Sequence, residues 1–297
     1  METMLERSAY AKVNLHLAVG QPFQDGYHPI RSLFALVNLC DEISIVVLDR
    51  GSFSVTVSGL EALSLQGEDT MSKASRLWCE RSNIPLSLHI TCKKHIPSQA
   101  GLGGGSSDAA AVLLLLQEYA KEDALDDHAL GEIALAVGSD VPFFLSSHPC
   151  ALVSGRGEHI VPVSTRALYI ALIMPTSIAI STSSAYGMLD ALRNGGEVDL
   201  GPSDAKIVEV FKNSPAVWNS LLYNDFQQCV AEYAIYADLA TICNTFPGFS
   251  GLSGSGACWF FVSDEHAAVS ALVALVQRQY GLHVTCYKTG LVVDELR

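Results

Sequence analysis

A glycine-rich stretch in the first half of the chain decides the fold, and it reads Pro97-Ser98-Gln99-Ala100-Gly101-Leu102-Gly103-Gly104-Gly105-Ser106-Ser107-Asp108-Ala109-Ala110. It lies between an alternating segment typical of a β-strand, Leu86–Cys92, and a strongly apolar segment typical of a helix, Ser106–Tyr119. Glycines let backbone N–H groups turn toward an anion, and a helix start adds unpaired N–H donors with a positive dipole end. The stretch therefore predicts a phosphate cradle. A flexible linker would not run straight into so apolar a helix.

Two common nucleotide-binding loops fit this stretch poorly. A Walker A loop needs a lysine after its last glycine, and none follows Gly105. A dinucleotide-binding loop has a third glycine where Ser106 stands, and it needs a strand ending in an acid about twenty residues later, which is not found. An NAD-dependent enzyme is therefore a weaker hypothesis, which titration with NADH would test.

The composition describes an acidic chain with ample material for a core. Of the 297 residues, 49% are apolar and 16% are charged, and the length suggests two domains or one domain with two lobes. Lys and Arg total 18 against 31 Asp and Glu, which gives a formal net charge of −13. Such a surface repels nucleic-acid phosphates and anionic lipids, so neither nucleic acid nor membrane is an expected partner. A phosphate-bearing ligand then requires a local electropositive pocket.

Cysteine usage and the N-terminus favour a reducing, cytoplasmic location. None of the eight cysteines forms a CxxC pair and no histidine is spaced to complete a zinc site, so no structural metal is expected. Met1–Arg7 carries acids and no long apolar stretch, so no signal peptide is predicted. Ala167–Leu189 is uncharged and long enough to span a bilayer, but Pro175 and the polar block after it favour a buried strand at its start.

The first element expected is a strand over Ala9–Leu17, where apolar and polar residues alternate. This period of two places Lys12, Asn14 and His16 together on the face opposite the apolar one. On an isolated strand, most polar side chains of this kind are simply exposed to solvent. Solvent exposure and a functional face therefore both remain open hypotheses from the pattern alone.

The rest of the pattern mixes strands and helices without regular alternation, which favours an α+β fold over a doubly wound sheet. Thr70 is a candidate N-cap, Gly138 is a natural helix end, and a change in pattern near Val163 suggests a boundary between lobes. Strands are expected over Ile30–Leu39, Glu42–Leu48, Phe53–Val57, Leu86–Cys92, Cys150–Val153, His159–Val163, Leu168–Met174, Ala257–Val262 and His283–Lys288. Helices are expected over Thr70–Arg81, Ser106–Tyr119, Asp126–Val137, Phe226–Thr245 and Glu265–Gln279.

The glycine-rich stretch resembles the second motif of the GHMP small-molecule kinases, P-x-x-x-G-L-[GA]-[SG]-[SG]. Two further family motifs occur in order, Ala11-Lys12-Val13-Asn14-Leu15 and Gly251-Leu252-Ser253-Gly254-Ser255-Gly256-Ala257-Cys258, so the resemblance covers almost the whole chain. It implies the two-lobed α+β fold of that family, with an N-terminal ATP-binding lobe over residues 1–163 and a C-terminal α/β sandwich lobe over 164–297. It also implies an enzyme that uses ATP, assisted by Mg²⁺, to phosphorylate an alcohol.

Three shorter motifs narrow the resemblance: Asp25-Gly26-Tyr27-His28, Gly138–Phe144 and Asn224-Asp225-Phe226. They are similar to those of a family member whose alcohol substrate carries a cytidine diphosphate group, in the non-mevalonate route to isoprenoid precursors. That small molecule is then the expected partner, with the chain acting as a monomer or a homodimer. The alternatives are another kinase of the family, acting on mevalonate, homoserine or a sugar, and a non-catalytic relative that only binds nucleotide.

The family pattern implies a role for each matching residue. Asp140 would act as general base toward the substrate hydroxyl, with the cation of Lys12 beside it, although an isolated Asp at such a position is more often a turn or N-cap residue. Tyr27 and Tyr186 would stack on the cytosine ring, and His28 would hydrogen-bond its edge. The residues expected to bind ATP are Pro97, Ser98, Gln99, Ala100, Gly101, Leu102, Gly103, Gly104, Gly105, Ser106 and Ser107, and those expected to bind substrate are Asn14, Tyr27, His28, Thr182 and Tyr186.

Three details of these motifs remain open. Gln99 stands where many relatives carry a small residue, which puts the way the loop covers the nucleotide in question. Ser106 and Ser107 could bond phosphate oxygens, ligate Mg²⁺ or cap the helix, and no protein metal site is required because Mg²⁺ arrives bound to ATP and water. The segment Ser253–Gly256 either approaches the phosphates or braces the first glycine-rich loop.

Overall fold

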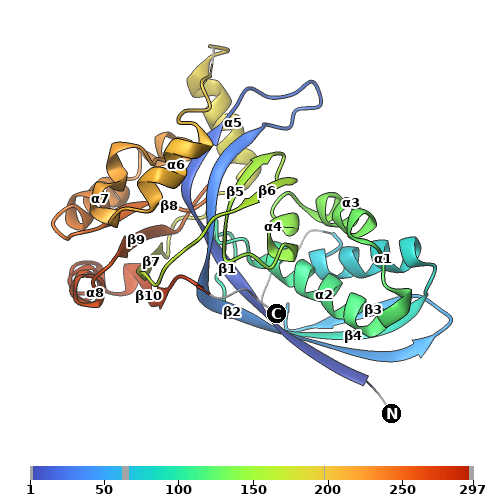
Figure 1. The fold of residues 1–297 in the computed structure, drawn as a ribbon. Helices are drawn as coiled ribbons and strands as arrows, with labels where there is room; N and C mark the ends of the chain where they lie inside the picture. The colour runs from blue at the N-terminus through green and yellow to red at the C-terminus, as the bar shows by residue number, and fades with distance from the viewer. Residues whose placement is uncertain (1–2, 62–66, 197, 294–297) are drawn as a thin grey trace. The chain divides into compact units, whose positions relative to one another are not determined.

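The computed structural model describes residues 3–61, 67–196 and 198–293, which form two compact units (Figure 1). The first unit takes in the chain up to Ala11 together with Leu39–Ser98 and Gly103–His148. The second takes in Lys12–Asn38, Gln99–Leu102 and the chain from Pro149 onward. Neither unit is continuous in sequence, because the two long strands β1 (Thr3–Val19) and β2 (Ile30–Arg50) pass through both. The division at residue 163 therefore stays a prediction about family domains and differs from the units that packing defines.

The first unit is a helical layer on a small sheet. Strand β4 pairs antiparallel with the second half of β2 and parallel with β3, and Figure 1 shows α1, α2 and α3 gathered on one side of these strands. The elements are β3 (Ser54–Ser58), α1 (Thr70–Ser82), β4 (Leu86–Lys93), α2 (Gly104–Ala120), a 3₁₀ turn (Lys121–Asp123), α3 (Asp127–Val137) and α4 (Val141–Leu145).

The second unit contains a four-stranded antiparallel sheet in the order β10-β7-β9-β8. The first half of β2 pairs with β5, which forms a hairpin with β6. The strands are β5 (Cys150–Gly155), β6 (His159–Pro162), β7 (Tyr169–Pro175), β8 (Phe249–Leu252), β9 (Trp259–Ser263) and β10 (Val284–Gly290). The helices are α5 (Thr182–Arg193), α6 (Asp204–Phe211), α7 (Ala234–Cys243) and α8 (His266–Tyr280), with 3₁₀ turns at Pro215–Ser220, Asp225–Val230 and Gly281–His283.

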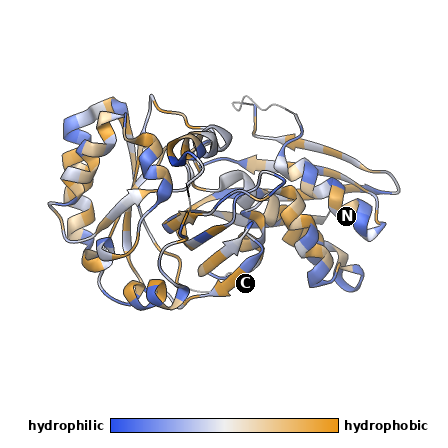
Figure 2. Cartoon of the chain, turned by 90° about the horizontal axis from the view of Figure 1, so that it is seen from above, coloured by the Kyte–Doolittle hydropathy of each residue, from blue (hydrophilic) through white to orange (hydrophobic). Residues whose placement is uncertain are grey.

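The α+β fold class is confirmed, and most expected elements lie where the sequence pattern puts them. In Figure 2 the larger helices carry both apolar and polar residues, as helices with one buried and one exposed side must. The uncharged stretch Ala167–Leu189 is divided between strand β7 and helix α5. Within the described parts of the chain, no helix has the length and apolar character needed to cross a membrane.

Three expectations about these elements are wrong. The strands expected over Ile30–Leu39 and Glu42–Leu48 are one strand, because Asp41 between them is buried and accepts the backbone N–H groups of His95 (2.5 Å) and Ile96 (2.8 Å). The helix α1 is capped by Asp69 and not by Thr70, since the Asp69 carboxylate accepts two N–H groups of the first turn at 3.0 Å.

The helix expected over Phe226–Thr245 is also wrong. A short 3₁₀ turn begins at Asp225, and the helix α7 starts only at Ala234. Asn224 fixes this turn, because its side chain accepts the N–H of Phe226 (2.9 Å) and donates to the carbonyl groups of Leu252 (2.7 Å) and Gly254 (2.9 Å). These bonds to a distant loop override the helical pattern of the segment.

His16 on β1 is fully buried in the second unit. Its Nδ1 accepts the backbone N–H of Tyr223 at 3.3 Å, and its Nε2 has no hydrogen-bond partner among the described residues. Burial first, and then the positive charge of Arg31, lower the pKa of His16 from 6.5 to about 4. The fold therefore requires a neutral imidazole at this position.

We expect this burial to make stability depend on pH. Below pH 6.5 the unfolded chain binds a proton at His16 that the folded chain refuses until about pH 4, so the free energy of unfolding falls as the pH falls. A His16→Asn variant keeps an acceptor for the N–H of Tyr223 but does not titrate. Urea unfolding of both proteins should show the wild type losing about 2 kcal/mol relative to the variant between pH 7 and pH 4.5. A difference independent of pH would contradict this account.

Candidate active site

The glycine-rich loop runs from β4 to the start of α2. Gly103 is the N-cap residue of α2 and takes a left-handed conformation, with φ at 71°. It has no side chain to cap the helix, so the first N–H groups of α2 are left for an external acceptor. A 17-residue helix with an uncapped N-terminus favours an anion at this end.

The middle of this loop is held by hydrogen bonds to its backbone inside the second unit. The backbone N–H of Lys12 donates to the carbonyl of Leu102 at 2.9 Å, and the N–H of Cys258 donates to the carbonyl of Ala100 at 3.1 Å. The hydroxyl of Ser253 donates to the carbonyl of Gly101 at 2.9 Å. The C-terminal glycine-rich segment therefore braces the first loop, which is one of the two possibilities that the sequence left open.

Gly101 cannot carry a side chain at this contact. Its φ is 72°, and a Cβ there would lie 2.0 Å from the carbonyl oxygen of Ser253. Gly254 also lies against Gly101, and a Cβ on Gly254 would lie 3.1 Å from the carbonyl oxygen of Gly101. The two glycine-rich segments are thus packed backbone against backbone.

Gln99 also takes a left-handed conformation, with φ at 54°, but its side chain is exposed. A glycine would adopt this geometry at lower cost. The Gln99 carbonyl still accepts the N–H of Ala257 at 3.4 Å, so the departure from the family pattern leaves the brace in place.

A buried charge cluster holds the segment that leads into the loop. Lys94 Nζ lies 2.5 Å from a carboxylate oxygen of Asp41 and 2.8 Å from Oδ2 of Asp108 on α2. Burial raises the pKa of Asp108 from 3.8 to about 7 in spite of the neighbouring ammonium group. The sequence pattern did not reveal this cluster, although Asp108 stands inside the quoted glycine-rich stretch.

Lys12 and Asn14 lie side by side on β1 and are buried, with 4% and 2% of their surface exposed. Lys12 Nζ donates to Oδ1 of Asn14 at 2.7 Å, and Nδ2 of Asn14 donates to the hydroxyl of Ser32 at 3.0 Å. The Lys12 ammonium also lies 4.8 Å from the centre of the Phe34 ring. Solvent exposure of this strand face is therefore wrong, since burying a lysine requires partners of this kind.

Asp140 belongs to the first unit, directly before the five-residue helix α4. It is half-buried and occupies the N-cap position, but its side chain makes no capping hydrogen bond. The two residues that follow it on the buried side, Val141 and Phe143, are fully enclosed. An N-cap role does not explain this aspartate, and a catalytic role for it stays a prediction.

Helix α5 brings three of the expected substrate residues together in the second unit. Thr182 and Tyr186 are one turn apart on α5, and the ring of Tyr186 lies 4.8 Å from the ring of His28. The hydroxyl of Thr182 lies 3.3 Å from that of Ser255 in the C-terminal glycine-rich segment. Tyr27 is 56% exposed, which suits a ring that stacks on a ligand.

Two charged residues in this region were not singled out by the sequence pattern. Asp190 on α5 lies 2.8 Å from Nε2 of His28. The guanidinium of Arg156 lies 5.1 Å from the centre of the Tyr27 ring and forms an ion pair with Asp25 at 2.5 Å. Asp190 could have been found, because it stands one helical turn after Tyr186, whereas Arg156 reaches Tyr27 only through the fold.

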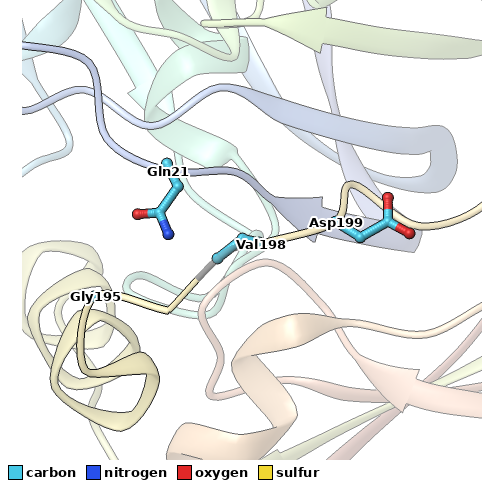
Figure 3. Close-up of a pocket in the computed structure, with 4 residues that line it drawn as sticks. All are labelled: Gln21, Gly195, Val198 and Asp199. Atoms are coloured by element: carbon cyan, nitrogen blue, oxygen red, sulfur yellow. The ribbon is translucent and has the colours of Figure 1, made fainter.

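A pocket of about 510 Å³ lies in the second unit and is lined by Gln21, Gly195, Val198 and Asp199 (Figure 3). The amide of Gln21 donates to the carbonyl of Gly196. The carboxylate of Asp199 points away from Gln21. None of these four residues is among those that the sequence singled out.

Comparison with known proteins decides the family. Over 275 residues the chain is 37% identical to a 4-diphosphocytidyl-2-C-methyl-D-erythritol kinase of Anaeromyxobacter dehalogenans, covering 91% of this chain and 84% of that protein. The chain belongs to this kinase family. The enzyme of the same name from Thermosipho africanus is 35% identical, with 86% and 89% of the two chains covered. Residues 69–148 also match the family described as "GHMP kinases N terminal domain".

Solved structures agree with this assignment. The crystal structure of a 4-(cytidine 5'-diphospho)-2C-methyl-D-erythritol kinase covers 97% of this chain and 99% of its own, with 26% identity and a TM-score of 0.74. A homoserine kinase from Cytophaga hutchinsonii matches with a TM-score of 0.63 at 15% identity, which shows the shared fold alone. The resemblance to GHMP kinases stated from the motifs is confirmed.

Membership in this kinase family implies ATP as co-substrate. The uncapped start of α2 offers backbone N–H donors, which suit an anion such as a triphosphate. A Cβ on Gly104 would lie 3.0 Å from Ile96 and 3.4 Å from Lys94 Nζ. A Cβ on Gly105 would lie 3.5 Å from the Thr70 hydroxyl, an ordinary van der Waals contact.

For this kinase, we expect Gly101 and Gln99 to respond differently to alanine. Gly101→Ala should lower the free energy of unfolding by about 2–4 kcal/mol, because it adds both left-handed strain and a clash with Ser253. Gln99→Ala is the matched control, because residue 99 also has a positive φ angle but its side chain is exposed. This variant should change the free energy of unfolding by less than about 0.5 kcal/mol. Chemical denaturation measures both. Equal stability of the two variants would show that the brace does not hold the loop.

Proposed function

We propose that the chain transfers the γ-phosphoryl group of ATP to the 2-hydroxyl group of 4-diphosphocytidyl-2-C-methyl-D-erythritol, in the non-mevalonate route to isoprenoid precursors. The observation that carries the proposal is the group formed by Tyr186, His28 and Asp190, with Tyr27 next to it in the chain. Two aromatic rings and a held imidazole suit recognition of a nucleobase. Mevalonate and homoserine have no base for such a group to hold.

The triphosphate would bind at the loop and the first turn of α2, over residues 97–107. A chain with a net charge of −13 does not attract a triphosphate through its overall electrostatic field. The backbone N–H groups of this segment supply the local hydrogen-bond donors instead. Mg²⁺ would enter as part of the MgATP substrate and would neutralise charge on the transferring group. Among the described residues, no three His, Cys, Asp or Glu side chains gather into a site for a metal ion.

Asp140 is proposed to accept the proton of the attacking hydroxyl group, and Lys12 to offset negative charge as the phosphoryl group moves. Asn14 holds the Lys12 ammonium at 2.7 Å and is itself fixed by Ser32, so the cation has one defined position. In a loose phosphoryl-transfer transition state such positioning contributes much of the rate. These roles come from the family pattern and are supported by the burial of Lys12.

The cytidine end of the substrate would lie in the second unit. Tyr27 and Tyr186 would stack on the ring, His28 would bond its edge, and Thr182 would bind near the alcohol. The 56% exposure of Tyr27 and the contact of Tyr186 with His28 support this assignment. A cytoplasmic location, and a monomer or homodimer as the working form, complete the proposal.

An Asp140→Asn variant tests the proposed base. Its affinity for ATP should stay within a few-fold of wild type, since the phosphate loop is untouched, while turnover should fall by about 10² or more. ADP release under saturating substrates measures turnover, and calorimetry measures ATP binding. Near-normal turnover would exclude a base role for Asp140.

A panel of alcohols tests the substrate. ADP release should be fastest with the cytidine-linked methylerythritol and negligible with mevalonate, homoserine and free sugars. CMP and CDP should inhibit competitively, because they fill the proposed base site but lack the methylerythritol hydroxyl that is phosphorylated. Turnover of another alcohol without inhibition by CMP would favour a different kinase of the superfamily. ATP binding without any turnover would favour the non-catalytic alternative.

A further inference from the structure

The ring of His28 is held from two sides by residues of α5. Its side chain is only 6% exposed, the ring of Tyr186 lies against it at 4.8 Å with a tilt of 32°, and Oδ1 of Asp190 lies 2.8 Å from Nε2. Nδ1 of His28 has no hydrogen bond to any residue in the described ranges. One ring nitrogen is therefore committed to the protein, and the other is left for a ligand.

The carboxylate of Asp190 determines which nitrogen carries the proton. An ionised carboxylate only accepts hydrogen bonds, so Nε2 must donate to it. In a neutral imidazole the other nitrogen is then unprotonated and can only accept. The contact with Asp190 thus makes Nδ1 of His28 an acceptor.

Pyrimidine bases differ in the group that such an acceptor meets. Cytosine carries an exocyclic amine at C4, which donates, whereas uracil carries a carbonyl oxygen there, which accepts. An acceptor at Nδ1 pairs with the amine and repels the carbonyl oxygen. A site built to bond one of these groups discriminates strongly against a ligand that lacks it.

We propose that Asp190 is a positioning residue that selects cytosine over uracil by fixing the tautomer of His28. The inference rests on the proposed use of His28 to bind the base of a cytidine diphosphate substrate. It adds a residue outside the sequence motifs and a physical reason for the choice between two nucleobases.

Helix α5 is anchored so that Asp190 keeps its position. One turn further on, Arg193 donates to the carbonyl of Val19 and to the carboxylate of Asp225, both at 2.7 Å. At the start of the helix, Thr182 contacts Ser255. Both ends of α5 are therefore tied to other parts of the second unit. These contacts hold the helix, and Asp190 with it, in a fixed position next to His28.

The test compares the cytidine-linked and uridine-linked forms of the same diphosphate alcohol in wild type and Asp190→Asn. The amide can donate as well as accept, so it permits both tautomers of His28. We expect the ratio of kcat/KM for the cytidine-linked substrate to kcat/KM for the uridine-linked substrate to fall by about tenfold or more. The change should lie in KM, and kcat for the cytidine-linked substrate should be little altered. Asp190→Ala, which leaves Nε2 to water, should give the same result if the asparagine variant fails to fold.

Asp204→Asn is the matched control. The Asp204 side chain is 54% exposed and forms an ion pair with Arg31 at 3.1 Å, so the variant removes the same charge from a comparable surface position without touching His28. It should keep the wild-type preference for cytosine. An equal loss of activity toward both substrates in Asp190→Asn, or an unchanged ratio, would overturn the proposal.

Calorimetric titration with CMP and UMP separates this inference from the proposed function. Wild type should bind CMP about tenfold or more tightly than UMP, and Asp190→Asn should lose most of that difference. If wild type shows this preference but phosphorylates neither substrate, the proposed reaction fails and the base selection stands. If wild type binds CMP and UMP equally, the base selection fails whatever the enzyme phosphorylates.

Discussion

The contact between two glycine-rich segments is the constraint on which the candidate site depends. Gly101 and Ser253 approach so closely that no Cβ fits between them, and three further backbone hydrogen bonds join the same segments or attach them to β1. The contact fixes the middle of the loop, and the uncapped start of α2 follows directly after this segment. A phosphate cradle made of backbone donors needs this support, since such donors bind only where the chain holds them.

A second constraint is the burial of polar groups in the second unit. Lys12, Asn14 and His16 lie on one face of β1 and are all buried. Asn14 bonds both Lys12 and the distant Ser32, and Nδ1 of His16 accepts the N–H of the distant Tyr223. Such burial is costly unless every group is satisfied, so it is tolerated where position matters more than stability. For Lys12 and Asn14 the proposed chemistry gives a reason. For His16, burial lowers the pKa of the ring, and its Nδ1 accepts the backbone N–H of Tyr223.

Elements whose residues interact locally could be predicted from the sequence, whereas features that depend on contacts between distant segments could not. Glycine spacing and apolar periodicity were enough to place the loop, the helix α2 and the hairpin of β5 and β6. The continuity of β2 was missed because Asp41 resembles a turn residue until its buried backbone partners are known. The burial of Lys12 was equally out of reach, since a strand pattern does not show what covers its second face. Asp190 could have been placed near Tyr186 from its helical spacing, but its contact with His28 could not be predicted, because His28 lies far away in the sequence.

Hydrogen exchange of the backbone amides tests the central claim most directly. If the start of α2 is a phosphate cradle, the N–H groups over residues 103–106, which precede the first intrahelical bond from Ser107 to Gly103, bind the phosphates of ATP. Adding a non-hydrolysable MgATP analogue should then slow exchange at these amides more than elsewhere in the first unit. Protection of other amides by the analogue, with exchange at residues 103–106 unchanged, would contradict the cradle and the kinase mechanism built on it.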